Sequence, residues 1–158
     1  AVARFLREKH SFLIGEQTAE WIKIHFGQAL KTGRDRRLEI RGQDIDRSAP
    51  GLLTISSAEI RDAIAKPVDD MVMVVMRLLE KVPPELSGDL VDRGMVLTGG
   101  GAMLDGLDLL IRNRTGIPVR IVPNPLTAAV EGAGRMLEDF SLYRRFFVED
   151  KEERESLE

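Results

Sequence analysis

The sequence predicts an α/β fold, and three observations in its second half support this class. Residues 94–98 (GMVLT) and 119–122 (VRIV) are short apolar runs typical of buried strands. Each run is followed by a stretch with apolar residues at helical spacing, over 104–114 and 126–137. The order strand, helix, strand, helix favours parallel strands connected by helical crossovers.

The first 27 residues are predicted to form two helices. Apolar residues at helical spacing, with charged residues between them, indicate a helix over residues 1–10. Gly15 interrupts the chain, and Thr18 is expected to cap a second helix that ends near Gly27. The side chains expected on the buried face of this second helix are those of Trp21, Ile22 and Phe26.

Two antiparallel strands are predicted in the middle of the chain. Alternation and β-branched residues favour strands over residues 37–45 (RLEIRGQDI) and 52–57 (LLTISS). The Ser-Ala-Pro-Gly sequence at residues 48–51 is expected to form the turn between them.

The segment after these strands is predicted to contain the central helix of the core. Ser57 opens a first helix, and Pro67 is expected in the first turn of a separate helix. The Pro83-Pro84 pair should end that second helix. Because its opposite side is also apolar, we expect most of its circumference to be covered. Its main apolar face consists of Val68, Met71, Val72, Val75, Leu78, Leu79 and Val82.

The composition excludes several kinds of site. The chain has no cysteine, which fits a cytoplasmic protein and rules out disulfides and thiolate chemistry. His10 and His25 are too few for a zinc site of histidines alone. A net charge of -3 gives no general reason to bind nucleic acid, and the arginine-rich residues 31–47 are interpreted as a solvated basic face. No signal peptide is recognisable, and the most apolar run, residues 71–79, is too short to span a membrane.

Three consecutive glycines, Gly99 to Gly101, follow the strand predicted at residues 94–98. Glycines at such a junction let the backbone turn sharply and let a flat or phosphorylated ligand approach closely. A tight structural turn fits the same residues, since the triplet matches neither G-x-G-x-x-G nor the P-loop. Without a nearby lysine, these glycines would face the base or sugar of a nucleotide rather than its reacting phosphate.

A second candidate group is formed by Glu16, Glu20 and Lys23 on the predicted second helix. Glu20 and Lys23 are three residues apart, share a helix face, and could together hydrogen-bond the two hydroxyls of a ribose. Such a pair is also typical of a solvent-exposed ion pair with no ligand.

Several blocks of the sequence, taken in order, resemble the second half of the MreB family of bacterial actin homologues. The resemblance runs to about Glu138 and therefore covers most of the chain. The blocks are IGEQTAEWIKIHFG (14–27), IRGQDI (40–45), PPELSGDLVDRGMVLTGGGAMLDGLD (83–108), TGIPV and NPLTAAVEGAGRMLE.

The resemblance implies an incomplete actin-like ATPase (ribonuclease H-like) fold with a small inserted α+β subdomain. Residues 1–28 and 67–148 would belong to the larger subdomain of the second domain. Residues 29–66 would form the small inserted subdomain, and residues 149–158 a disordered acidic tail.

The resemblance also implies the ligand, which is ATP or ADP, with magnesium held mainly by the absent first half. Glu20 and Lys23 would lie on one side of the adenosine, with Glu16 as a less certain member. The opposite wall would consist of Gly99, Gly100, Gly101, Ala102 and Met103. Neither a catalytic residue nor a metal ligand is expected in this chain. Because both phosphate-binding loops of the family are missing, we expect no ATP hydrolysis by this chain alone.

The function implied is that of a filament-forming cytoskeletal protein that determines cell shape by organising wall synthesis. Its expected partners are further copies of itself, the cell-wall elongation machinery and the inner face of the cytoplasmic membrane, so that it is cytoplasmic and membrane-associated as filaments. Residues 31–47 are a candidate polymer contact. The segment SLYRRFF (141–147) is either a helix packed back on the domain or an interfacial membrane anchor.

Two other functions remain open at this level. The same superfold hosts heat-shock ATPases and sugar kinases, although no sugar-contacting loop or catalytic aspartate is recognisable. A truncated fragment that retains only an interaction role is the third possibility. For any of these, we expect a partly exposed apolar face where the missing strands should lie, and hence a tendency to associate.

Overall fold

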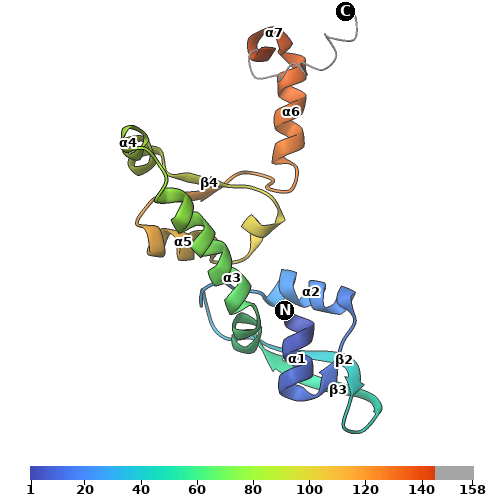
Figure 1. Cartoon of the computed structure of the whole chain (residues 1–158). Coiled ribbons are helices and arrows are strands. Elements are labelled where there is room, and N and C mark those ends of the chain that lie inside the picture. Colours follow the sequence, from blue (N-terminus) through green and yellow to red (C-terminus); the bar gives the residue numbers. More distant parts are fainter. Residues whose placement is uncertain (145–158) are drawn as a thin grey trace, which may run out of the picture.

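The computed structural model describes residues 1–144, which contain two small sheets linked by one long helix (Figure 1). The helices are α1 (Val2–His10), α2 (Glu16–Phe26), α3 (Ser57–Leu79), α4 (Pro84–Arg93), the 3₁₀ helix η1 (Gly100–Met103), α5 (Leu107–Thr115), α6 (Ala128–Glu138) and α7 (Phe140–Tyr143). The strands are β1 (Phe12–Leu13), β2 (Arg37–Asp44), β3 (Ala49–Ser56), β4 (Met95–Leu97) and β5 (Val119–Ile121). The expectations for the 149–158 tail and for Phe146 and Phe147 lie outside the described residues.

The antiparallel sheet has the order β1-β2-β3 and confirms the two strands predicted in the middle of the chain. Ile40 and Ile55 point to its buried face, while Arg41 points to solvent. The predicted turn at residues 48–51 is wrong. Asp44 pairs with Ala49, so the turn lies before that residue and the Ala-Pro-Gly segment belongs to β3.

Helix α3 is one continuous helix, so the helix break predicted at Pro67 is wrong. Its first turn is held by a capping box, in which the Ser56 side chain accepts from the Glu59 N–H and the Glu59 carboxylate accepts from the Ser56 N–H. Proline removes one backbone donor, but a buried apolar stripe continues past Pro67, and its packing keeps the helix continuous. The stripe consists of Ile60, Ile64, Val68 and Val72.

The α3 stripe is the centre of the hydrophobic core, and α1, α2, β3 and α5 all contact α3. Its second half is not covered on most of its circumference, contrary to prediction. Met71, Met73, Val74 and Leu78 are between 40% and 61% exposed. This helix therefore carries an exposed apolar face.

The parallel pairing of β4 with β5, linked by α5, confirms the predicted α/β layer. The helix predicted from Leu104 begins only at Leu107. Gly106 has a left-handed backbone (φ 75°), which separates the 3₁₀ helix η1 from α5. Helix α4 was not predicted, whereas α6 confirms the last expected helix and extends away from the rest of the chain (Figure 1).

The two predicted N-terminal helices are confirmed as α1 and α2, with two corrections on α2. Thr18 is not the cap, since α2 begins one residue after Gly15. Trp21 is 46% exposed, although Ile22 is fully buried and Phe26 packs against the core. Trp21 instead stacks on the ring of His25, with 4.6 Å between ring centroids, because residues four apart on a helix are neighbours.

Candidate functional site

The polar residues predicted on α2 lie along one stripe of the helix. Glu16, Glu20, Lys23 and Gly27 are spaced by four, three and four residues, which places them on one face of an α-helix. The three charged residues are exposed, whereas Gly27, just after the helix end, is buried. The stripe therefore presents its charges to solvent and ends at a packed contact.

Glu20 and Lys23 form an ion pair with each other. The Lys23 ammonium donates to both carboxylate oxygens of Glu20, at 2.6 and 2.7 Å. The side chains are 48% (Lys23) and 58% (Glu20) exposed, so solvent screens the pair and little free energy opposes its rearrangement. Together they offer a donor and an acceptor on one helix face.

The glycine-rich turn follows β4 and leads into the 3₁₀ helix η1. Gly99 has φ 80°, a backbone conformation that side chains disfavour, and its N–H donates to the Pro125 carbonyl at 2.8 Å. A Cβ on Gly100 would lie 3.3 Å from the Leu126 side chain. The positive φ thus accounts for Gly99, and the exposed Leu126 side chain limits the space at Gly100.

Gly101 differs from the other two glycines of the turn. A Cβ on Gly101 would meet nothing within 4 Å, and its φ is not positive. Next to it Ala102 is buried, while Met103 is 56% exposed. At Gly101 and Met103 the turn therefore offers a bare backbone edge and an apolar side chain to solvent.

The end of α2 meets this turn directly. A Cβ on Gly27 would lie 3.1 Å from the Leu104 side chain, and Gln28 forms an isolated parallel β-bridge with Asp105. The Ala29 N–H donates to the Asp105 carbonyl at 2.7 Å. The structure thus places the end of the α2 stripe against the residues that directly follow Met103.

A polar cluster at this junction was missed by the sequence analysis. It comprises Gln28, Thr32, Arg61 and Asp105, whose side chains are joined by hydrogen bonds. Gln28 and Asp105 are 77 residues apart and no short motif connects them, so the sequence carried no local signal for the cluster.

The pKa of Asp35, which lies beside this cluster, is lowered by hydrogen bonds from Arg61 and Lys31. Among residues 1–144, Glu59 is the other carboxylate with a shifted pKa. Partial burial would raise the pKa of Glu59, but the bonds it accepts outweigh burial and lower the pKa to about 2. Those bonds come from the Ser56 backbone and hydroxyl, Lys9 and His10. Both carboxylates are therefore held ionised by structural contacts.

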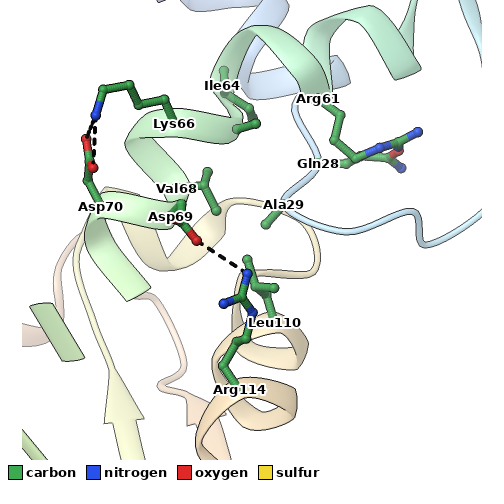
Figure 2. A pocket seen from close by; sticks show the side chains of 11 residues that line it. Gln28, Ala29, Arg61, Ile64, Lys66, Val68, Asp69, Asp70, Leu110 and Arg114 are labelled. Carbon is green, nitrogen blue, oxygen red and sulfur yellow. Dashed lines mark hydrogen bonds and ion pairs between the residues drawn. The ribbon is translucent and has the colours of Figure 1, made fainter. Parts of the chain in front are cut away.

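Two surface pockets lie on the described residues, and Gln28 and Arg61 of the polar cluster help to line the smaller of the two. One, of about 460 Å³, lies between α3 and α5, and its wall carries the Lys66–Asp70 and Arg114–Asp69 ion pairs (Figure 2). The other, of about 580 Å³, is lined by residues of α1 and the segment that follows it. Neither is lined by any predicted nucleotide-binding residue.

Within residues 1–144, no group of three or more acidic or histidine side chains is arranged to hold a metal ion. No helix in that part of the chain is both long enough and apolar enough to cross a membrane.

Comparisons with known proteins agree on one family. The family model described as MreB/Mbl protein matches residues 1–145. The cell shape-determining protein MreB of Escherichia coli K12 is 42% identical over 143 residues, which is 90% of this chain and 41% of that protein. The cell shape-determining protein Mbl of Bacillus subtilis 168 is 37% identical over 138 residues, 87% of this chain and 41% of its own. The chain thus spans about two fifths of the length of these curated relatives.

Solved structures give the same result for the fold. MreB5 of Spiroplasma citri bound to ADP superimposes with a TM-score of 0.84 at 29% identity, over 92% of this chain and 44% of that one. The same protein bound to AMPPNP gives a TM-score of 0.83. A MamK double helical filament, at 18% identity and a TM-score of 0.71, shares the fold. The described residues are therefore part of an actin-like fold.

Proposed function

The chain belongs to the MreB/Mbl family of bacterial actin homologues, and on this premise we propose that it binds the adenosine part of ATP or ADP between α2 and the glycine-rich turn. The observation that carries the proposal is the open backbone at Gly101. The packing of this chain requires neither a missing side chain nor an unusual φ at that residue. A flat ligand lying against the turn would explain the glycine, because it needs a position without a side chain.

The α2 stripe supplies the polar contacts in this proposal. Lys23 donates and Glu20 accepts, which matches two neighbouring ribose hydroxyls. Their mutual ion pair is exposed, so it can open without leaving a buried charge unpaired. Glu16, one turn further from the glycines, is a peripheral member of the site.

The apolar contact in this proposal comes from the turn. Met103 is more than half exposed, and its thioether side chain can adapt to an aromatic base. Gly99 and Gly100 shape the turn, and Ala102 anchors it in the core. The MreB5 structures solved with ADP and AMPPNP support this choice of ligand.

The described residues offer no lysine or metal-binding carboxylate group at the glycine-rich turn. We therefore assign to this chain neither the magnesium that accompanies the nucleotide nor any step of phosphoryl transfer. Its role in the site is to bind and orient adenosine.

At the level of the cell, we propose a part in a filament that determines cell shape, with wall-synthesis proteins and the membrane surface as partners. The names of the relatives, and the filament formed by the fold neighbour MamK, support this proposal. The proposed subdomains are residues 1–28 with 67–148, and residues 29–66. The basic residues 31–47 are the proposed contact between subunits, because much of their surface is exposed.

A titration of the 158-residue chain with a fluorescent ATP analogue, with ADP as competitor, tests the adenosine site. We expect saturable binding that the Glu20→Ala/Lys23→Ala double variant abolishes, without phosphate release. The matched control is Lys66→Ala/Asp70→Ala, which removes another exposed ion pair from a helix face. If the folded parent chain shows no binding, or the control loses as much affinity as the test variant, the proposed site is wrong.

A further inference from the structure

The side chain of Gln28 lies where α2, α3 and the glycine-rich turn meet, and it is only 5% exposed. Its amide nitrogen donates to the Thr32 hydroxyl at 3.0 Å and to the Asp105 carboxylate at 3.1 Å. Its amide oxygen accepts from the Arg61 guanidinium at 2.9 Å. Figure 2 shows Gln28 and Arg61 side by side.

The orientation of the Gln28 amide follows from its partners. Arg61 can only donate and an ionised Asp105 can only accept, so the oxygen must face Arg61 and the nitrogen must face Asp105. Flipping the amide would oppose donor to donor and acceptor to acceptor. Only a neutral side chain with a donor and an acceptor at its end satisfies both neighbours.

Asp105 is the point at which this cluster holds the turn. Its carboxylate accepts from Gln28 and from the Thr32 hydroxyl, and its backbone carbonyl accepts from the Ala29 N–H. Gly106 adds close packing, since a Cβ there would lie 3.0 Å from the Thr32 side chain. Asp105 directly follows Leu104, whose N–H donates to the Gly101 carbonyl at 3.2 Å.

We propose that Gln28 is a positioning residue of the nucleotide site: through Asp105 it holds the glycine-rich turn at a fixed place against the end of α2. This inference rests on the proposed adenosine site. Gln28 does not touch the ligand in this proposal. It determines the relative placement of the two walls, and thereby the affinity for adenosine.

Gln28→Glu is the most direct test, because it keeps the size and the Arg61 contact but brings a carboxylate next to Asp105. Like charges at hydrogen-bond distance repel, and the turn should move away from α2. At about pH 8 we expect the Kd for the fluorescent ATP analogue to rise roughly tenfold.

The double variant Gln28→Glu/Asp105→Asn should restore binding to within about threefold of the parent. The pair then carries one negative charge again, because the side chain introduced at position 105 is neutral. Its amide can donate to the carboxylate introduced at position 28, and Arg61 still donates to that carboxylate. Rescue by a second substitution that leaves the ligand-facing residues unchanged would not result from general damage to the fold. Asn113→Asp, an exposed amide-to-acid change on α5, is the charge control and should leave the Kd unchanged.

Hydrogen exchange gives a readout that needs no nucleotide. The Ala102 and Leu104 amides bond within the turn, to Gly99 and Gly101. We expect these two amides to exchange faster in Gln28→Glu than in the parent, and to exchange at the parent rate again in the double variant.

Four outcomes test the two proposals. No binding by the folded parent chain overturns the adenosine site, and with it this inference. Binding by the parent with an unchanged Kd in Gln28→Glu overturns only the positioning role. A raised Kd and accelerated exchange in Gln28→Glu, with both returning in the double variant, supports it, whereas a loss that the second substitution does not rescue contradicts it.

Discussion

Gly27 and Leu104 join the two halves of the candidate site: a Cβ on Gly27 would lie 3.1 Å from the Leu104 side chain and would also collide with the Lys23 carbonyl. This contact connects the end of the α2 stripe to the segment that follows the glycine-rich turn. Any side chain at position 27 would therefore have to displace one of these two segments.

Gly27→Ala should destabilise the chain by about 1–3 kcal/mol, because the added methyl would collide with the Lys23 carbonyl and overpack against the Leu104 side chain. Denaturant unfolding followed by circular dichroism measures the change. Gly33→Ala is the control, since a Cβ there meets nothing within 4 Å, and it should be neutral or slightly stabilising. Equal effects at the two positions would contradict the close contact at Gly27.

Gly99→Ala and Gly101→Ala should distinguish an effect on stability from an effect on nucleotide affinity. Gly99 has φ 80°, so alanine there should cost about 1–2 kcal/mol in unfolding free energy. Gly101 has free space around it, and Gly101→Ala should change stability by less than about 0.5 kcal/mol while weakening binding of the ATP analogue. Unchanged nucleotide affinity in Gly101→Ala would argue against a ligand on this turn.

Stability should decrease in acid through Glu59. Its pKa in the folded chain is about 2, below the ordinary value of 4.5, so the unfolded chain takes up the proton first as pH falls. The stabilising contribution should be complete above about pH 4.5 and should be lost as pH falls toward 2. Urea midpoints measured across this range, for the parent and for Glu59→Gln, test the prediction.

Glu59→Gln should lower stability above about pH 4.5, because it weakens the capping box and the contacts with Lys9 and His10. It should also flatten the pH dependence across this window. A parent and variant with parallel profiles would show that another group causes the acid effect.

The exposed apolar face of α3 should promote association. Val74 and Leu78 are 55% and 61% exposed, and Val74→Glu/Leu78→Glu should shift the chain toward monomer in sedimentation or light scattering at high concentration. Lys66→Ala on the same helix is a surface control and should leave the distribution unchanged. A parent chain that is fully monomeric at high concentration would contradict the prediction.

Local elements were predicted well where the signal lies within one segment. The strand of residues 37–45 and the helix over residues 1–10 follow from spacing alone, and their observed bounds differ by one residue. The predicted break at Pro67 failed because proline predicts a local preference, whereas the buried stripe from Ile60 to Val72 packs against other elements on both sides of it. The burial predicted for Trp21 also failed, and its ring instead stacks at the surface on His25 of the same helix.

By itself, the sequence determined the α/β class, the family and the residues of the proposed nucleotide site, because periodicity, glycines and long matching blocks are properties of contiguous residues. Only the tertiary structure decided that Gly27 meets Leu104, that Gln28 bonds to Asp105, and that Gly101 alone of the three glycines has neither a positive φ nor a close neighbour. These relationships join segments more than about 70 residues apart, or depend on the space around a backbone. Both are set by how the elements pack, and no pattern within one element contains that information.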